Sequence, residues 1–297
     1  MTFVKAVRKQ AKLRLALTGP SGSGKTYSSL LMAKGLGGKV AVIDTEHGSA
    51  SLYCDLMEFD VMELTAPYTP ERYIAAIKAA EQGGYDTLII DSITHEWNGT
   101  GGMLQLNEQL AASKYKGNTW SAWSESDPRH RKFVDAILQA NMHVIATMRS
   151  KTETSSEKDS NGKTKILQLG MKAEQRDGII YEFTTVLDLV HGGNFATATK
   201  DRTGLFSGDP QVITPDTGAA LIGWLNTGVE APAFNDEQFV FYQSDMLNSE
   251  NLEALKDAFK VAYKYAKGFN NEDAVTAATN VYNGRKAEFE AAQEPAQ

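Results

Sequence analysis

Residues 19–26 constrain the fold of this chain more than any other segment, because they spell Gly-Pro-Ser-Gly-Ser-Gly-Lys-Thr. The run matches the pattern G-x-x-x-x-G-K-[ST], in which backbone N–H groups of a glycine-rich loop surround phosphate oxygens. An apolar run at residues 13–19 predicts a strand before the loop, and residues 25–36 predict a helix after it. This strand–loop–helix unit predicts a phosphate site at a helix N-terminus, where the helix dipole favours anions.

The residue types in this loop predict ATP and Mg²⁺ as cofactors. Gly22 and Gly24 let the backbone turn inward, and the Lys25 ammonium reaches the β- and γ-phosphates. The Thr26 hydroxyl is expected to bind Mg²⁺. The predicted nucleotide-binding residues form one continuous segment: Gly19, Pro20, Ser21, Gly22, Ser23, Gly24, Lys25, Thr26 and Tyr27.

Strands and helices alternate through the first 190 residues, which predicts an α/β fold of three layers with a mainly parallel sheet. The expected strands cover residues 13–19, 39–45, 86–91 and 143–148, and the expected helices cover residues 25–36, 69–84 and 128–140. We expect an ATPase domain at residues 1–230 and a small helical extension at residues 231–297. Two helices are expected there, one capped by Ser249 and the other following Asn271.

Composition excludes several other classes of protein. The single cysteine, Cys54, excludes a disulfide framework and a cysteine zinc cluster. The longest apolar runs span about five residues, far below the ~18–20 that cross a membrane, so we expect no membrane partner and a cytoplasmic location. The net charge of −7 argues against a protein that coats nucleic acid along its whole surface.

Acidic residues at strand ends supply the candidates for metal binding and catalysis. Asp91 follows the apolar run Leu-Ile-Ile and is expected to hold Mg²⁺. Hydrolysis also needs a carboxylate that polarises the attacking water, but the position after Asp91 is Ser92. Glu46 and Glu96 are the alternatives. We favour Glu46, because a parallel sheet brings the carboxyl ends of adjacent strands together.

Residues 42–46 (VIDTE) and 88–92 (LIIDS) resemble the matching segments of RecA-type recombinases. In that superfamily the catalytic glutamate ends the strand that precedes the strand of the metal aspartate, where Glu46 falls. Residues 11–205 resemble the phage-encoded, AAA-labelled ATPases of this superfamily, including the Sak-type ATPases associated with single-strand annealing. The resemblance implies a RecA-like Mg²⁺-dependent ATPase that acts on single-stranded DNA in phage recombination or replication. It also implies a homo-oligomer, as a ring or a filament, and a location in the bacterial host cytoplasm.

The same resemblance suggests further γ-phosphate contacts. The segment HVIATMRSK is similar to the strand that carries a polar γ-phosphate sensor, with Thr147 and Arg149 as candidates. Residues 198–204 resemble the Lys-x-Arg-x-Gly hairpin of hexameric RecA-like helicases, whose cations reach the nucleotide of a neighbouring subunit. Lys200 and Arg202 are therefore expected to act in trans, unless they only form a solvated strand edge.

Two polar segments are candidates for contact with nucleic acid. Residues 99–127 contain Lys114, Lys116, Trp120 and Trp123, and residues 149–172 hold six basic and three acidic residues around a predicted turn at 159–162. Lysines contact phosphates and exposed tryptophans stack on bases; the alternative is a hairpin with core tryptophans.

A second hypothesis for the whole chain is an ATP-gated loader that binds a phage annealing or replication protein through its C-terminal helices. A small-molecule kinase is disfavoured, because no cluster of lid arginines is present.

Overall fold

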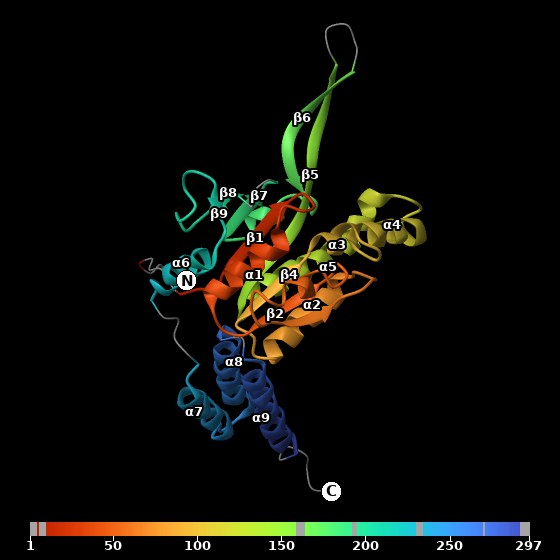
Figure 1. Ribbon diagram of the computed structural model, residues 1–297. Coiled ribbons are helices and arrows are strands. Elements are labelled where there is room, and N and C mark those ends of the chain that lie inside the picture. The colour runs from red at the N-terminus through yellow and green to blue at the C-terminus, as the bar shows by residue number, and fades with distance from the viewer. Residues whose placement is uncertain are drawn as a thin grey trace. The chain divides into compact units, whose positions relative to one another are not determined.

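The computed structural model describes residues 5, 10–158, 164–191, 195–229, 234–269 and 271–291, and only the backbone of residues 152–158 and 164–170. The chain divides into two compact units, residues 1–229 and residues 230–297. Most elements of both units are labelled in Figure 1.

The first unit is built on one mixed, mostly parallel sheet. Its described strands are β1 (Arg14–Gly19), β2 (Val40–Asp44), β3 (Asp60–Glu63), β4 (Thr87–Asp91), β5 (His143–Lys158), β6 (Thr164–Ala173), β7 (Thr185–Leu189), β8 (Phe195–Asp201) and β9 (Gln211–Val212). Their order is β3-β2-β4-β5-β1-β7-β8-β9, and β6 pairs with β5 outside this path. The strands from β3 to β7 in this order run parallel, whereas β8, β9 and β6 are antiparallel to their neighbours. The predicted α/β fold with a mainly parallel sheet is confirmed.

Helices cover both faces of this sheet (Figure 1). The described helices of the first unit are α1 (Lys25–Leu36), α2 (Pro70–Gln82), α3 (Thr94–Asn98), α4 (Met103–Lys114), α5 (Thr119–Gln139) and α6 (Pro215–Asn226), with short 3₁₀ turns at Ala50–Tyr53 and Ile179–Tyr181. Side chains of α2 and α5, such as Tyr73 and Phe133, pack on one face of the sheet. Side chains of α1 and α6, such as Leu30 and Leu221, pack on the other. The three layers therefore enclose two buried apolar cores.

The strand order brings the carboxyl ends of four strands to one edge. β5 lies between β1 and β4, and in this register Gly19 stands opposite Arg149. β2 lies on the other side of β4, with Asp44 opposite Asp91. The phosphate loop after β1 and the acidic ends of β2 and β4 therefore meet at the same edge.

The two candidate nucleic-acid segments differ from the expected loops. Residues 103–114 form α4, and α5 begins at Thr119 rather than at Pro128, which lies inside the helix. β5 continues to Lys158 and pairs with β6 in a long antiparallel hairpin, which projects from the sheet in Figure 1. The predicted turn at residues 159–162 lies outside the described residues.

In its described residues, the second unit contains three helices where the sequence predicted two. They are α7 (Asp236–Leu247), α8 (Leu252–Gly268) and α9 (Glu272–Ala291). The predicted cap Ser249 is wrong: Asn251 caps α8, and its side chain accepts a hydrogen bond from the Ala254 N–H at 2.9 Å. Phe259 and Tyr282 stack with ring centroids 4.5 Å apart, so α8 and α9 share an apolar core within this unit.

Candidate nucleotide site

The loop between β1 and α1 holds a backbone shape that glycine adopts most easily. Gly22 and Gly24 have φ angles of 76° and 84°, in the left-handed region where a Cβ atom would be strained. Gly24 directly precedes α1, and no side chain caps the first turn of this helix. The first N–H groups of α1 therefore lack an acceptor within the helix, which is the arrangement that binds phosphate.

This loop forms one wall of a pocket of ≈ 210 Å³. The pocket brings together residues from the loop, from the turn after β2 and from the ends of β4 and β5: Ser21, Gly22, Gly24, Lys25, Thr26, Tyr27, Glu46, Ser49, Tyr53, Asp91 and Arg149. Ser23, also predicted to bind nucleotide, is a fully buried residue of the loop and does not line the pocket. Gly19 and Pro20 present their carbonyls to Lys25 rather than lining the pocket.

Lys25 extends along the loop into this pocket. Its ammonium donates to the carbonyls of Gly19 and Pro20 at 2.9 and 2.8 Å. Burial lowers the pKa of Lys25, and the negative charges of Asp91 and Glu46 oppose this effect. The ammonium is thus held by weak carbonyl acceptors, which a phosphate oxygen can replace with a stronger, charge-assisted bond.

Thr26 and Asp91 are in direct contact and line the same pocket as Lys25. The Thr26 hydroxyl donates to Asp91 Oδ2 at 2.5 Å, and the Thr147 hydroxyl donates to Oδ1 at 2.5 Å. Asp91 is only 2% exposed, and burial raises the pKa of its carboxyl in spite of both hydrogen bonds. Within the described ranges, no group of three His, Cys, Asp or Glu side chains could hold a metal ion. One hydroxyl and one carboxylate nevertheless fit Mg²⁺, which completes its shell with water and substrate phosphates.

Asp44, at the end of β2, fixes the turn that carries Glu46. Its carboxylate accepts hydrogen bonds from the backbone N–H groups of Glu46 at 2.6 Å and of Ala50 at 2.9 Å. The turn includes His47, with φ 58°, and Gly48, with φ 80°. This sharp reversal directs the Glu46 side chain back toward the phosphate loop.

The Glu46 carboxylate is paired with Arg149. Arg149 donates from Nε to Oε1 at 3.0 Å and from Nη2 to Oε2, and the Ser92 hydroxyl donates to Oε1 at 3.2 Å. Burial raises the pKa of Glu46, but the hydrogen bonds and charge of Arg149 outweigh it and leave the pKa below its usual value. Glu46 is therefore ionised at neutral pH and faces the pocket.

The structure separates the alternatives that the sequence left open. Arg149 lines the pocket, whereas Thr147 is buried and holds Asp91. Glu96 is fully buried away from the pocket lining and accepts hydrogen bonds from Gln175 at 3.2 Å and contacts His130 Nδ1 at 3.0 Å. Geometry thus favours Glu46 over Glu96 and Arg149 over Thr147.

Lys200 and Arg202 do not line the pocket of their own chain. The Lys200 ammonium donates to the carbonyls of Ile180, at 3.3 Å, and Tyr181. β8 ends at Asp201, so the exposed Arg202 lies just beyond the strand. Action in trans by this pair stays a prediction.

Two pocket residues, Ser49 and Tyr53, were missed in the sequence. Tyr53 contacts Tyr27 edge-to-face, with ring centroids 5.8 Å apart. Both residues belong to the turn and 3₁₀ segment after β2, which matches no motif. Of the two tyrosines in contact, only Tyr27 could be named from the sequence, because it directly follows the phosphate-loop motif.

The fold and the pocket together define a P-loop nucleotide-binding protein. The chain matches the AAA domain family over residues 11–216, more than half of its 297 residues, and it belongs to this family of P-loop ATPases. A search of curated proteins finds no match. Among the helices that the structure describes, none is long and apolar enough to cross a membrane.

Proposed function

We propose that this protein is a Mg²⁺-dependent ATPase that couples ATP hydrolysis to single-stranded DNA, in phage recombination or replication. The observation that carries the proposal is the convergence of Lys25, Thr26, Asp91 and Glu46 on one pocket at the start of α1. Phosphate binder, metal ligands and an ionised carboxylate are the parts that phosphoryl transfer to water requires.

Each side chain has a separate task in this proposal. The Lys25 ammonium and the N–H groups of the loop bind the β- and γ-phosphates, and Thr26 and Asp91 hold Mg²⁺. When bound, Mg²⁺ offsets the negative charge of the phosphate oxygens. The Glu46 carboxylate orients a water molecule in line with the γ-phosphate and accepts its proton as the new P–O bond forms and the bond to ADP breaks.

Arg149 has two roles in the proposal. Its guanidinium pairs with Glu46, and it lines the same pocket as Lys25, within reach of a γ-phosphate. Arg149 also lies on β5, at the point where this strand leaves the sheet for the hairpin. A change at the hairpin can therefore reach Glu46 through a single strand, which supports coupling between nucleic acid and hydrolysis.

The test is ATP turnover with and without single-stranded DNA, comparing the wild type with Glu46→Gln. We expect DNA to stimulate the wild type and the variant to lose about 10²–10⁴-fold in kcat, because Gln cannot accept the proton. The matched control is Glu96→Gln, which changes a carboxylate that lies outside the pocket and should keep turnover. Unstimulated turnover that is indifferent to Glu46 would refute the proposal.

A second candidate is an ATP-gated loader of a DNA-annealing partner. The separate apolar core of α7, α8 and α9 favours it, as does the net charge of −5 over residues 234–297, from 6 basic and 11 acidic residues. A loader that lacks residues 230–297 should lose its partner and keep its basal hydrolysis. The ATPase proposed above should then keep DNA stimulation as well.

A further inference from the structure

Three of the four tryptophans of the chain gather at one surface pocket of the first unit. Trp97, Trp120 and Trp123 line a pocket of ≈ 370 Å³ together with Asp127 and Arg176. Trp97 comes from α3 and the other two tryptophans from α5, while Arg176 follows β6. Segments that are distant in the sequence therefore assemble one aromatic site.

The rings of this site are arranged for stacking. Trp97 and Trp123 lie nearly parallel, at 15°, with ring centroids 5.6 Å apart, and the Arg176 guanidinium lies 5.8 Å from the Trp123 ring. Trp120 is 86% exposed. A large, flat apolar side chain left in water is the kind of surface that a ligand covers.

The tryptophan pocket is continuous with a second one, at the base of the hairpin. Trp97 and Arg176 line both, and the second, of ≈ 540 Å³, adds Lys151 of β5 and Lys172 of β6. Lys151 pairs with Glu174 at 3.7 Å and Lys172 with Asp177 at 2.7 Å. Exposed ion pairs of this kind contribute little stability, so phosphate groups can compete for these cations.

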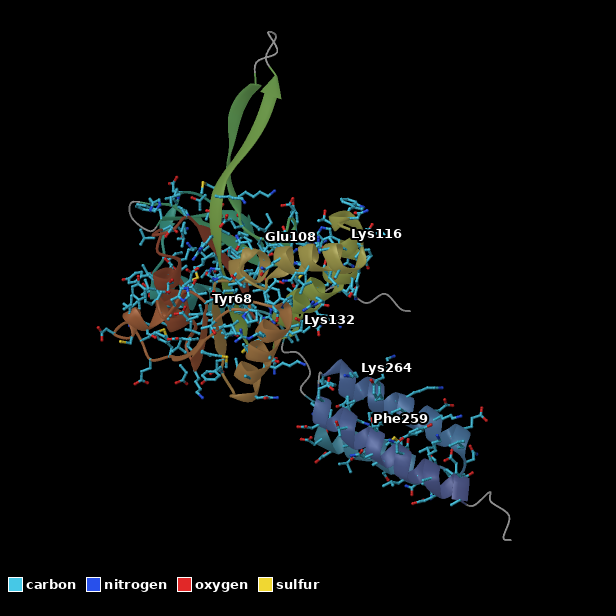
Figure 2. All side chains as sticks on the ribbon, turned by 90° about the vertical axis from the view of Figure 1, so that its right-hand side faces the viewer. Tyr68, Glu108, Lys116, Lys132, Phe259 and Lys264 are labelled. Atoms are coloured by element: carbon cyan, nitrogen blue, oxygen red, sulfur yellow. The ribbon has the colours of Figure 1, made fainter. Side chains whose placement is uncertain are left out.

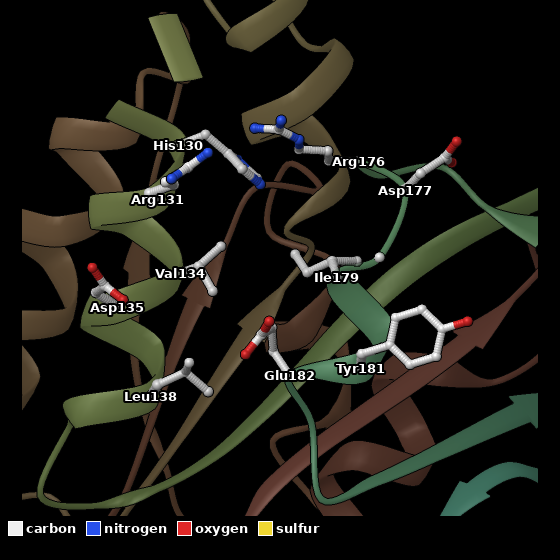
Figure 3. Close-up of a pocket in the computed structure, with 11 residues that line it drawn as sticks. His130, Arg131, Val134, Asp135, Leu138, Arg176, Asp177, Ile179, Tyr181 and Glu182 are labelled. Carbon is white, nitrogen blue, oxygen red and sulfur yellow. The ribbon is translucent and has the colours of Figure 1, made fainter. Parts of the chain in front are cut away.

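Arg176 occupies the centre of this surface. Figure 3 shows its side chain extending from the segment after β6 toward α5, beside His130, above another pocket of ≈ 500 Å³. It forms an ion pair with Asp127 of α5. Figure 2 labels Glu108 on α4 and Lys116 just after this helix, next to the start of α5 in the sequence.

Short contacts join the aromatic site to the nucleotide pocket. α3 begins three residues after Asp91, and the Thr94 hydroxyl accepts a hydrogen bond from the Arg149 N–H at 2.9 Å. Gln175, next to Arg176, donates to the Ile93 carbonyl at 2.9 Å. A ligand at Trp97 therefore lies one short helix away from Asp91 and Arg149.

We propose that Trp97, Trp120, Trp123 and Arg176 form a stacking site for bases of a single-stranded nucleic acid, whose phosphates run past Lys151 and Lys172. The inference rests on the proposed function and names its DNA-contacting surface. Parallel indole rings beside a guanidinium match the flat faces of bases, and the lysines at the adjoining pocket match a phosphate backbone.

The experiment uses the full chain carrying Trp224→Phe, so that all remaining tryptophan fluorescence comes from the site. An oligodeoxythymidine should quench it. A labelled oligodeoxythymidine then measures affinity by anisotropy for Trp120→Ala, Trp120→Phe and a control, Phe241→Ala, whose ring is 58% exposed in the second unit. Because Trp120 is exposed, its replacement leaves the core intact.

We expect Trp120→Ala to weaken binding by about 5- to 150-fold, the loss that removal of one base-stacking ring causes. Trp120→Phe should restore most of the affinity, and the control should bind as the parent does. An abasic oligonucleotide of equal length should bind Trp120→Ala and its parent alike, because it offers phosphates without bases. ATP turnover in the absence of DNA should not change.

Three results would overturn the inference. If Trp120→Ala binds DNA normally while DNA still stimulates turnover, the proposed function stands and the DNA site lies elsewhere. If the parent neither binds DNA nor responds to it, the proposed function fails as well. If Trp120→Ala instead abolishes self-association measured by light scattering, with DNA affinity unchanged, the tryptophans form a contact between copies of the chain.

Discussion

At the scale of single residues, the ion pair between Glu46 and Arg149 controls the charge of the proposed catalytic base. Burial alone would raise the pKa of Glu46, and Arg149 reverses this. In Arg149→Gln the burial remains and the positive charge is lost, so the pKa of Glu46 should rise. Because only the ionised carboxylate accepts a proton, the acid limb of the kcat–pH profile should move to higher pH.

We also expect Arg149→Gln to lower kcat by roughly 10²-fold at neutral pH, since it removes a donor beside the transferred phosphate. The measurement is steady-state turnover between pH 4 and pH 8. Arg129→Gln is the matched control, because Arg129 forms a similar pair with Glu71, at 2.7 Å, outside the pocket. An unshifted acid limb would mean that Arg149 does not set the charge of Glu46 during turnover.

Replacing the Asp91 carboxylate should raise the stability of the fold and lower the rate of ATP turnover. Burial raises the pKa of the Asp91 carboxyl, so above the pKa of the unfolded chain folding must either take up a proton at Asp91 or keep a charge that water would solvate better, and both cost stability. Asp91→Asn removes that cost. Its melting temperature at pH 7, without nucleotide, should exceed that of the wild type by a few degrees, and the gain should vanish below about pH 4, where the carboxyl is protonated.

The same Asp91→Asn variant should lose turnover by at least ~10²-fold, because an amide is a poor ligand for Mg²⁺. Thermal denaturation followed by circular dichroism and an ATPase assay test the two halves separately. Asp135→Asn changes an exposed aspartate on α5 and should alter neither quantity. A melting temperature for Asp91→Asn below that of the wild type would show that the carboxylate stabilises the fold through its two hydroxyl donors.

At the scale of helices and strands, the sequence predicted the elements that bury an apolar face. The strands at β1, β2 and β4 and the helix α1 agree with expectation within a residue or two, because the strands are fully buried apolar runs and α1 starts at the phosphate-loop motif. β3 was missed, since all four of its residues are exposed and show no alternation. The hairpin was predicted only as the alternative to a DNA-contacting loop, because residues 152–165 are almost all polar and a polar run carries no periodic signal.

The site was predictable to the extent that motifs define it. Lys25, Thr26, Asp91 and Glu46 follow from the phosphate loop and from strand ends that a parallel sheet must align. The Trp97 site was not predictable, because α3, α5 and the segment after β6 meet only through tertiary packing. Trp120 and Trp123 could be named as exposed candidates, but their partner Trp97 could not.

Shortening the β5–β6 hairpin should alter the response to single-stranded DNA without altering basal ATP hydrolysis. Residues of β5 up to Arg149 pair with β1 or β4, whereas Ser150–Lys158 pair with β6 alone. Glu153 stands opposite Gly170, so residues 154–169 can be replaced by an Asn-Gly turn. The shortened protein should melt at the wild-type temperature and keep basal turnover within about twofold, since its sheet and pocket are unchanged.

The shortened protein should also lose part of its stimulation by single-stranded DNA, because it lacks Lys158, Lys163 and Lys165 but keeps Lys151, Lys172 and the tryptophan pocket. ATP turnover across a range of DNA concentrations measures this. The control is a second variant that keeps both strands and exchanges only residues 159–162 for other polar residues. Full stimulation of the shortened protein would place DNA contact away from the hairpin. Loss of basal turnover by a folded variant would show that the hairpin supports the catalytic pocket directly.

At the scale of the whole molecule, the absence of Lys200 and Arg202 from their own pocket raises the question of assembly. A head-to-tail contact between identical subunits generates a ring or a filament and lets one copy complete the site of the next. Lys200 is held by backbone carbonyls, whereas Arg202 is exposed just beyond β8. Arg202 is therefore the better candidate for a group that acts on a neighbour.

A mixing experiment tests this assembly. Lys25→Ala disables the pocket of a subunit but leaves its Arg202, whereas Arg202→Ala leaves the pocket intact. Each variant alone should lose at least ~10³-fold in turnover, because an arginine that stabilises the transferring phosphate contributes that much. In an equimolar mixture, about a quarter of the interfaces pair an intact pocket with an intact Arg202 of the next subunit, so turnover should recover to about that fraction of the wild type.

Arg202→Ala mixed with the double variant Lys25→Ala/Arg202→Ala is the control and should stay inactive. If mass measurement shows mixed assemblies without any recovery, Arg202 does not act across subunits, and its place after β8 serves the strand edge alone.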